Sequence, residues 1–288
     1  MENQSLRTIL LFTFVIIKNT KNTHTMNSKK VSNHIVNWLK NYAINAGVKG
    51  FVVGVSGGID SAVTSSLCAK TGLPTICVEM PIHQDSVQVS RAEEHINLLK
   101  KTHTNVNSVR TDLSKSFDVF QEAMPIIDSA ALKDLTLANT RARIRMTSLY
   151  YVAGINSSLV AGTGNKVEDF GVGFYTKYGD GGVDVSPIAD LVKSEVFELG
   201  AYLGVPSAIQ IAAPTDGLFG DSRTDEEQIG ASYDELEMAM KQTEQNVLFE
   251  DLNGRDKQVF EIYTRLNSRN QHKMNPIPVC IITDSLKF

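Results

Sequence analysis

Apolar and polar positions follow two different patterns along the chain. Between residues 28 and 45 the apolar side chains Val31, Ile35 and Leu39 recur at helical spacing, which predicts an amphipathic helix. The next run, 50–55, is continuous, apolar and rich in β-branched residues, as buried parallel strands are. A helix followed by a buried strand is therefore the first pair of elements that the sequence predicts.

The alternation of helix and strand continues as far as residue 162. A helix-compatible stretch covers 60–70. The later elements are a strand at 73–80, a helix at 85–101, a weaker strand at 105–110, a helix at 129–155 and a strand at 158–162. Strands separated by helices form a mostly parallel sheet that helices cover on both faces. The predicted fold class is therefore α/β, a doubly wound and mostly parallel sheet flanked by helices.

The chain beyond residue 220 has a different character. Charged helical patterns cover 224–242 and 256–273, and no further strand is evident. No internal repeat, low-complexity segment or linker divides the chain. We therefore expect residues 26–288 to form a single domain in which a helical C-terminal part covers the sheet.

An apolar run at 9–17 follows Arg7 and has some likeness to a signal peptide. No small-x-small cleavage site follows it, however, and it is far shorter than the ~20 residues that span a membrane. We expect residues 1–25 to be a non-structural extension, with Met26 as the functional beginning, rather than a secretion signal. A cytoplasmic protein without membrane contact is the corresponding prediction.

Composition narrows the class of protein. A hydrophobic share of 42% and a charged share of 21% are ordinary for a globular domain, and the net charge is only -4. Because no run of Lys and Arg is long enough to bind a polyanion, we expect no nucleic-acid partner. The three cysteines, Cys68, Cys77 and Cys280, lack any metal or disulfide spacing. We expect them to be reduced thiols, the first two of them buried.

The most distinctive turn follows the first strand and reads GVSGGIDS. Two glycines let the backbone approach an anion, while hydroxyls and the N–H groups of the following helix can bind phosphate oxygens. The lysine of the common P-loop is missing, so ordinary γ-phosphoryl transfer is not expected. A tight turn capped by Ser or Asp is the alternative, non-functional interpretation. The turn consists of Gly54, Val55, Ser56, Gly57, Gly58, Ile59, Asp60 and Ser61.

This turn resembles the pyrophosphate-binding loop of the N-type ATP pyrophosphatases, which include NAD synthetase, GMP synthetase, asparagine synthetase and the tRNA-lysidine enzymes. The resemblance implies an adenine nucleotide alpha hydrolase-like fold and a reaction that releases pyrophosphate while forming an adenylate. It also implies that Asp60 helps to hold Mg²⁺, a cation that prefers carboxylate and phosphate oxygens. A simple helix N-cap is the alternative role for Asp60.

A second unusual loop follows the last predicted strand. Its segment TKYGDGGVD (176–184) closely resembles the deamido-NAD-binding segment of the ammonia-dependent NAD synthetases, and the similarity extends in the same order over most of 28–275. The resemblance implies an amide ligase of NAD biosynthesis. ATP would activate the carboxylate of deamido-NAD as an adenylate, and ammonia would then form NAD with release of AMP. ATP as co-substrate, Mg²⁺ as cofactor and a homodimer are implied as well.

The resemblance also assigns roles to individual residues. Besides the glycine-rich turn, the residues implied to contact ATP are Thr163, Lys193 and Thr215. Those implied to bind Mg²⁺ are Asp60 and Glu168. Those implied to contact deamido-NAD are Arg143, Lys177, Asp184, His272 and Lys273. Taken singly, each could instead be a solvated lysine, a turn hydroxyl or a charge that favours a helix C-terminus. The loop after Glu168 is one residue longer than the family pattern, so Asp169 is an alternative metal ligand.

Free ammonia is the expected nitrogen donor. The segment before the glycine-rich turn is too short for a glutaminase domain, and no cysteine lies in a nucleophile-like context. Ammonia in the cell is mostly ammonium, so a base must remove a proton before the nitrogen can attack. Asp180, in the GDGG turn of the second loop, is the catalytic candidate for attracting or deprotonating it.

The predicted helix at 129–155 carries three arginines at two-residue spacing. Such spacing turns successive side chains by about 200°, so they cannot all contact one ligand. The family pattern selects Arg143, and we expect Arg141 and Arg145 to face solvent or a second subunit. A stripe of apolar residues on this helix is expected to meet the sheet, namely Leu135, Ala138, Ala142 and Leu149.

Other functions stay open from the residues alone. Another ATP-pyrophosphatase amide synthetase or a tRNA-modifying enzyme could use the same turn, although the missing basic patch argues against tRNA. Outside catalysis, the alternative is a non-catalytic adenine-nucleotide-binding sensor of related fold. The acidic candidates Asp60 and Glu168 favour an enzyme, because a sensor has less need of a metal bound to pyrophosphate.

Overall fold

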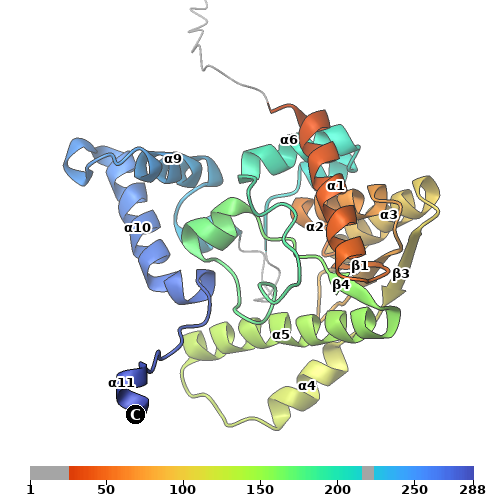
Figure 1. The fold of residues 1–288 in the computed structure, drawn as a ribbon, viewed down its shortest axis with the longest axis horizontal. Coiled ribbons are helices and arrows are strands. Elements are labelled where there is room, and N and C mark those ends of the chain that lie inside the picture. Colours follow the sequence, from red (N-terminus) through yellow and green to blue (C-terminus); the bar gives the residue numbers. More distant parts are fainter. Residues whose placement is uncertain (1–25, 216–223) are drawn as a thin grey trace, which may run out of the picture.

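The computed structural model describes residues 26–215 and 224–288. The predicted extension at 1–25 lies outside the described residues, and its nature stays a prediction. Along the described chain, helices and strands follow one another in nearly the order that the apolar pattern predicts (Figure 1).

Four parallel strands form the central sheet. They are β1 (Gly50–Gly54), β2 (Thr75–Glu79), β3 (Val106–Arg110) and β4 (Ser158–Val160). Their spatial order is β3-β2-β1-β4, so the chain runs outward from β1 to β3 and then returns to the other side of β1. In the register, Val52 of β1 pairs with Ile76 of β2 and with Val160 of β4.

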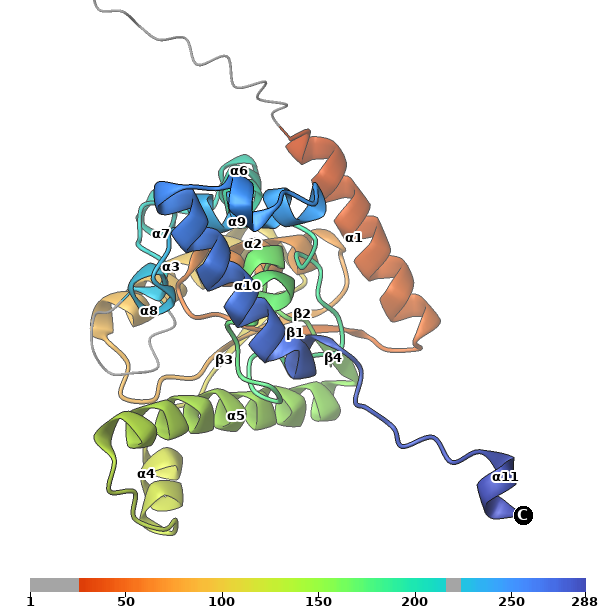
Figure 2. The same ribbon diagram turned by 90° about the vertical axis from the view of Figure 1, so that its left-hand side faces the viewer.

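Helices cover both faces of this sheet (Figures 1 and 2). One face carries α1 (Ser28–Asn45), α2 (Ile59–Lys70), α3 (Ser86–Thr102) and α6 (Lys193–Leu203). The opposite face carries the long helix α5 (Ala130–Asn156), and α4 (Ser114–Glu122) packs on α5. Right-handed crossovers explain this division, because the chain moves one way through α2 and α3 and back through α5. The predicted doubly wound α/β class is confirmed.

Apolar side chains fill both interfaces between the sheet and its helices. Leu39, Phe51 and Leu67 are fully buried on the α2 side, and Val52 and Val160 are fully buried on the α5 side. Strands that are buried on both faces read as continuous apolar runs, which is why the strand pattern was visible in the sequence.

The apolar stripe predicted for α5 is only partly correct. Ala138 and Ala142 are buried and Leu149 is half-buried, whereas Leu135 is 51% exposed. The expectation for Leu135 is wrong because the N-terminal part of α5 extends past the edge of the sheet (Figure 1).

The cysteines lie as the sequence predicts. Cys68 and Cys77 are buried and Cys280 is exposed, and all three are free thiols. Burial raises the pKa of both buried thiols, so they stay protonated and unreactive. Among the described helices, none combines the length and the apolar character that crossing a membrane requires.

A third apolar cluster joins the C-terminal helices to the segment after β4. It lies between a π-helix at Val167–Val172, α9 (Tyr233–Glu244) and α10 (Gly254–Met274). The remaining short elements are α7 (Ser207–Gln210), α8 (Asp225–Ile229), a 3-10 turn at Phe249–Asp251 and α11 (Asp284–Lys287). The apolar pattern does not predict the π-helix, α4 or α6.

The single helix predicted at 224–242 is wrong, because the structure divides it into α8 and α9. Gly230 ends α8 with a φ of 89°, a conformation that suits glycine. Ser232 then begins α9 with a capping box, in which its hydroxyl accepts the Glu235 N–H and the Glu235 carboxylate accepts the Ser232 N–H. The apolar spacing runs on across this break, so periodicity alone does not reveal it.

Candidate active site

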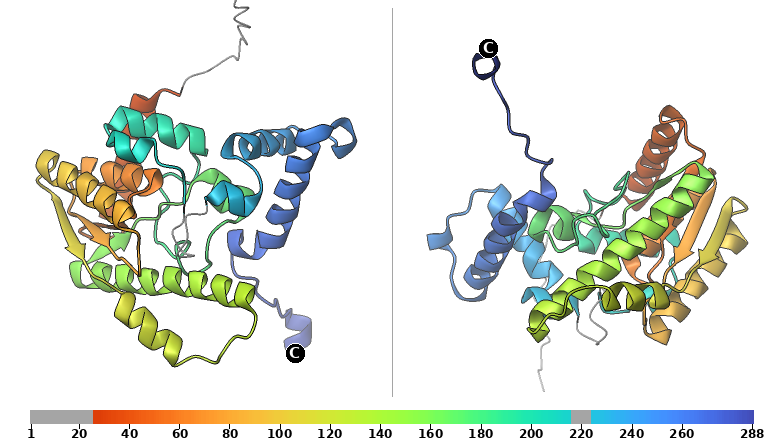
Figure 3. Two further views of the ribbon diagram at one scale, coloured as in Figure 1. Left: turned by 180° about the vertical axis from the view of Figure 1, so that it is seen from behind. Right: turned by 90° about the horizontal axis from the view of Figure 1, so that it is seen from below.

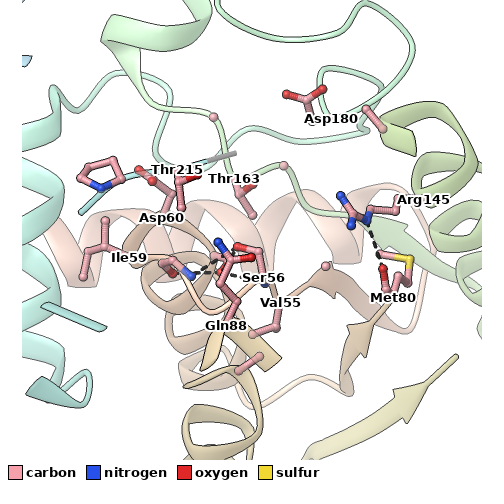
Figure 4. A pocket seen from close by; sticks show the side chains of 18 of the residues that line it. Val55, Ser56, Ile59, Asp60, Met80, Gln88, Arg145, Thr163, Asp180 and Thr215 are labelled. Atoms are coloured by element: carbon pink, nitrogen blue, oxygen red, sulfur yellow. Dashed lines mark hydrogen bonds between the residues drawn. The ribbon is translucent and has the colours of Figure 1, made fainter. Parts of the chain in front are cut away.

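A cavity of about 270 Å³ lies at the carboxyl ends of β1, β2 and β4, where open α/β sheets bind their ligands. Figure 4 shows Asp60, Thr163 and Thr215 close together in this cavity, with Arg145 beside Met80 at another part of its wall. Most residues predicted to bind ATP, metal or ammonia line it. They are Gly54, Val55, Ser56, Gly58, Ile59, Asp60, Ser61, Thr163, Glu168, Asp180, Lys193 and Thr215.

The glycine-rich turn has the backbone geometry of an anion cradle. Gly57 has a φ of 84°, and a Cβ atom there would lie 2.5 Å from the carbonyl oxygen of Gln88, so glycine is required. The Ser61 hydroxyl accepts the Ser56 N–H at 3.2 Å and donates to the Gly58 carbonyl at 3.0 Å, which holds the turn in shape.

The helix that follows the turn points its N-terminus at the cavity. Gly58 is the N-cap of α2, and within residues 26–215 and 224–288 no side chain caps the first N–H groups of this helix. Such N–H groups, together with the helix dipole, favour a bound anion. Asp60 lies in the first turn of α2, so the alternative that it is a simple N-cap is wrong.

A buried lysine joins the two predicted metal ligands. The Lys193 ammonium lies 2.6 Å from Asp60 Oδ2 and 2.9 Å from Glu168 Oε1, and the Lys193 side chain is only 3% exposed. Lys193 is the first residue of α6, whereas Glu168 belongs to the π-helix and Asp60 to α2. Three elements far apart in the sequence therefore meet at one cationic group.

Two residues that the sequence reasoning missed orient these carboxylates. Asn165 is fully buried, donates to Asp60 Oδ1 at 3.1 Å, and accepts the Glu168 N–H at 3.2 Å. The Tyr233 hydroxyl donates to Glu168 Oε1 at 2.5 Å and lies 3.1 Å from Asp225 Oδ2. Asn165 could have been suspected, because Asn commonly caps the start of a helix. The sequence carries no comparable signal for Tyr233.

The charges around the cavity leave an excess of carboxylates. Burial raises the pKa of Asp60, which Lys193 opposes and Glu168 reinforces. Burial also raises the pKa of Asp169 well above its usual range, and the charges of Glu168 and Asp180 add to this effect. The site therefore favours binding of a further cation. An anion is favoured only if it binds together with a cation.

The residues present fit Mg²⁺ that arrives with a polyphosphate. In the described parts of the chain, no three His, Cys, Asp or Glu side chains are grouped so as to hold a metal by themselves. Mg²⁺ binds through one or two carboxylates together with substrate phosphates, and Asp60 and Glu168 already share one cation in Lys193. The Asp169 carboxylate, by contrast, packs against the backbone of Gly164. A Cβ atom built on Gly164 would lie only 2.1 Å from Asp169 Oδ2.

Arg145 also lines the cavity, which corrects the expectation that it faces solvent or a second subunit. Its Nε donates to the Met80 carbonyl at 3.0 Å and its Nη2 donates to Gln84 Oε1 at 2.6 Å (Figure 4). The expectation for Arg141 is likewise wrong, because its guanidinium lies 4.4 Å from the centre of the Phe117 ring on α4. Helical spacing predicts that these two arginines lie on a different side of α5 from Arg143. It does not predict which residues each side of the helix contacts.

The residues predicted to contact deamido-NAD lie beside the cavity rather than in its wall. Arg143 Nε donates to the Lys177 carbonyl at 3.3 Å, and Lys177 Nζ donates to the His272 carbonyl. Lys273 Nζ donates to the carbonyls of Gly173 and Tyr175. The structure thus brings Arg143, Lys177, His272 and Lys273 together where the second loop meets the end of α10.

Asp184 and Asp180 hold the second loop in place. The Asp184 carboxylate accepts the Val160 N–H at 2.8 Å and the Tyr150 hydroxyl at 2.9 Å, so it ties the loop to β4 and α5. Asp180 lines the cavity, and its Oδ1 accepts the Thr176 N–H at 2.9 Å. Of these two residues, Asp180 is therefore the one that a ligand in the cavity can reach.

Known proteins with similar sequence or structure match this chain over most of its length. The NAD synthase family model matches residues 31–277. The NH(3)-dependent NAD(+) synthetase of Alkaliphilus metalliredigens is 37% identical over 85% of this chain and 96% of its own length. The solved NMN synthetase from Francisella tularensis has a TM-score of 0.76 and 32% identity, covering 90% of this chain and 99% of the other.

A more distant structure shares the fold. The NH3-dependent NAD synthetase from Campylobacter jejuni has a TM-score of 0.70 at 24% identity and covers 89% of this chain and 100% of its own. The match of the family model extends from α1 through the glycine-rich turn and the second loop to the end of α10. This chain therefore belongs to the NAD synthase family.

Proposed function

We propose that this protein is an ammonia-dependent NAD synthetase, a ligase that converts deamido-NAD and ammonia to NAD while splitting ATP to AMP and pyrophosphate. Membership of the NAD synthase family and the names of the relatives support this function. The observation that carries it is a single cavity that joins an anion cradle, a carboxylate pair around Lys193, and Asp180 of the second loop.

The reaction begins with activation of a carboxylate, which is too poor an electrophile for ammonia. A carboxylate oxygen of deamido-NAD attacks the α-phosphorus of ATP, and the bond from that phosphorus to pyrophosphate breaks. The turn at 54–61 and the N-terminus of α2 hold the polyphosphate, and Lys193 neutralises part of its charge. Asp60 and Glu168 would hold Mg²⁺, which would supply further charge neutralisation on the phosphates.

The second step makes the amide. Ammonia attacks the acyl carbon of the adenylate, and AMP leaves with the electron pair of the broken carbon–oxygen bond. We assign the removal of the proton from ammonium to Asp180, because its carboxylate lines the cavity. Asp180→Asn should lower turnover far more than it changes ATP affinity, and unchanged turnover would remove Asp180 from the mechanism.

Binding of the second substrate is assigned to the cluster beside the cavity. Arg143, Lys177, His272 and Lys273 form a basic group there, which suits the phosphates of deamido-NAD. Asp184 holds the adjoining backbone through the Val160 N–H and supports this surface. For the metal, Glu168 is preferred over Asp169 because it shares a cation with Asp60.

A homodimer in the cytoplasm completes the proposal. Large apolar side chains are exposed on α4 and α5, a surface that water disfavours and a second copy could cover. They include Val119, Phe120, Leu132, Leu135, Tyr151 and Ile155. Residues 26–288 are proposed to act as one domain within this dimer.

The decisive assay contains the purified protein, ATP, MgCl₂ and deamido-NAD, and follows NAD and pyrophosphate together. The proposal expects equal amounts of both products when ammonium is the nitrogen source, and none when glutamine replaces it. Absence of NAD under both conditions would return the chain to the wider group of ATP pyrophosphatases.

A second substrate merits the same assay, because the solved relative with a TM-score of 0.76 and 32% identity is called an NMN synthetase. That name points to amidation of nicotinate mononucleotide, which has the same pyridine carboxylate but lacks the adenylyl half. The two nucleotides should be compared by kcat/KM. A higher value for the mononucleotide would change the preferred substrate while keeping the same chemistry and the same cavity.

A further inference from the structure

Helix α10 directs three side-chain donors at the end of the π-helix. Asn267 Nδ2 donates to the carbonyls of Phe170 and Gly171, at 3.2 and 2.7 Å. Asn270 Nδ2 donates to the Val172 carbonyl at 2.8 Å. Lys273 Nζ donates to the carbonyls of Gly173 and Tyr175, at 2.7 and 2.8 Å. The three donor residues follow one another at intervals of three along α10. Each interval rotates about 60° less than a full turn, so the three side chains lie along one side of the helix.

The carbonyls of Phe170, Gly171 and Val172 lie in the last turn of the π-helix and need partners from outside their own helix. The last carbonyls of any helix lack an intrahelical donor, and leaving them unpaired beside packed side chains is costly. The π-helix ends at Val172, and its backbone leaves the helical conformation at Gly173. The side chains of α10 therefore act as a cap that another part of the chain supplies.

Gly173 gives separate support for a close and specific contact. It has a φ of 65°, and a Cβ atom at this position would lie 2.4 Å from Asn270 Cβ. Glycine therefore serves both the backbone turn and the close approach of α10. A loose contact between two surface elements would not require it.

The capped segment joins two groups of functional residues. Glu168, which contacts Lys193, lies at the start of the π-helix, and Lys177 and Asp180 follow directly after the capped carbonyls. Lys177 Nζ also donates back to the carbonyl of His272 on α10. Movement of α10 away from this segment would therefore displace residues on both sides of it.

We propose that Asn267, Asn270 and Lys273 are positioning residues that fix residues 170–175 and thereby set the second loop against the cavity. This inference rests on the proposed function, since it concerns how that reaction site is arranged. It gives Lys273 a positioning role in addition to its place in the basic group, because its ammonium binds two carbonyls of its own chain.

The test uses hydrogen–deuterium exchange of the full-length protein without substrates, followed by kinetics. Asn270→Asp keeps the size of the side chain but replaces the donor with an acceptor, and Lys273→Met removes a donor while Lys273→Arg keeps one. Ser268→Asp, on an exposed position of the same helix, controls for added negative charge. We expect exchange of amides 170–178 to rise about tenfold in Asn270→Asp and Lys273→Met, but not in Ser268→Asp or Lys273→Arg.

Kinetics then connects the contact to the reaction. Asn270→Asp should lower kcat/KM for deamido-NAD about tenfold, with a smaller change in the KM for ATP. Unchanged exchange in a folded Asn270→Asp protein would overturn the proposal, and if that variant does not fold, Lys273→Met decides by the same readout. Faster exchange with unaltered kinetics would overturn the positioning role. If even the unaltered protein makes no NAD, the proposed function fails, while the exchange result still decides whether α10 holds the segment.

Discussion

Lys193 neutralises two carboxylates at a place that water scarcely reaches. Its side chain is 3% exposed, and those of Asp60 and Glu168 are 18% and 16% exposed. Burial alone would lower the pKa of Lys193, but the charges of Asp60 and Glu168 together outweigh it and raise the pKa. The ammonium therefore stays charged and occupies the position of a cation in the free protein.

Replacement of Lys193 by Met should destabilise the folded protein. Two buried carboxylates would lose their counter-charge, and the free energy of unfolding should fall by about 3 kcal/mol. Added MgCl₂ should stabilise this variant more than the unaltered protein, because the vacated position suits a cation. Urea denaturation followed by circular dichroism, with and without MgCl₂, measures both effects.

Lys166→Met is the matched control for that experiment. Lys166 is more exposed and pairs with Glu244 at 3.4 Å, so its loss should change the free energy of unfolding by no more than about 0.5 kcal/mol. Equal stability of Lys193→Met and the unaltered protein would contradict the argument.

His95 is a second residue whose charge state depends on burial. It is 1% exposed, and its Nε2 lies 2.9 Å from the Ser65 hydroxyl beneath the glycine-rich turn. Burial lowers the pKa of His95 to about 4, against 6.5 for the free side chain. The unfolded chain thus takes up a proton below pH 6.5 that the folded protein refuses until pH 4.

Acid should therefore destabilise the protein through His95. The contribution is absent above pH 6.5 and grows as the pH falls towards 4, where it reaches about 3 kcal/mol. His95→Gln should remove it, so the stability of the variant relative to the unaltered protein should rise as the pH falls from 7 to 4. Denaturation curves across this range provide the measurement.

At the scale of elements, β4 depends on a side chain from the loop that follows it. This edge strand has three residues, and the Asp184 carboxylate accepts the Val160 N–H and the Tyr150 hydroxyl. Burial, and then Asp184, raise the pKa of Tyr150, so the phenol stays a donor. The contact therefore ties strand, helix and loop together at one point.

Asp184→Ala should lower the free energy of unfolding by about 1–3 kcal/mol, because it leaves the buried Val160 N–H and the Tyr150 hydroxyl without this partner. Tyr150→Phe, which removes one of the two donors, should have a smaller effect. Thermal or urea denaturation decides. Asp190→Ala, at a fully exposed side chain, is the control and should leave stability unchanged. Loss of deamido-NAD affinity without loss of stability would instead favour direct contact with substrate.

The sequence predicts the elements that have a continuous or periodic apolar pattern of their own. It misses the elements that are stabilised by contacts with distant parts of the chain. The strands and α5 are visible because burial imposes an apolar pattern over many residues. The π-helix is not, since it is stabilised by contacts with α9 and α10 that lie far along the chain. Similarly, motifs select Asp60 and Lys193, but only the fold brings Arg145 to the same cavity and sets Asn165 and Tyr233 against the carboxylates that line it.

For the whole molecule, helices α4 and α5 and the segment after α10 each carry several exposed apolar side chains. α4 and α5 lie together on one side of the molecule, in the lower part of Figure 1, and the C-terminal segment after α10 leads away from the body (Figures 2 and 3). That segment exposes Ile277, Val279 and Ile281 by at least 66% each. Exposed apolar side chains of this kind favour association with another protein surface.

A dimer through α4 and α5 gives a direct prediction. Light scattering after size-exclusion chromatography should give twice the 31.6 kDa of one chain. Leu135→Asp places a charge in the proposed interface and should shift the protein to a single chain. Met238→Asp, at a 52% exposed apolar residue on α9, should remain a dimer. A monomeric unaltered protein would rule out this assembly.

The π-helix has a consequence for how such chains diverge. A π-turn accommodates one more residue than an α-helical turn over the same path, so the turn at Val167–Val172 has room for the extra residue that the family pattern predicts after Glu168. A gene that gains one codon here can therefore keep Lys193 opposite Glu168 on one side and the TKYGDGG segment in place on the other. A one-residue insertion beside a functional carboxylate can be tolerated when a single helical turn confines the structural change.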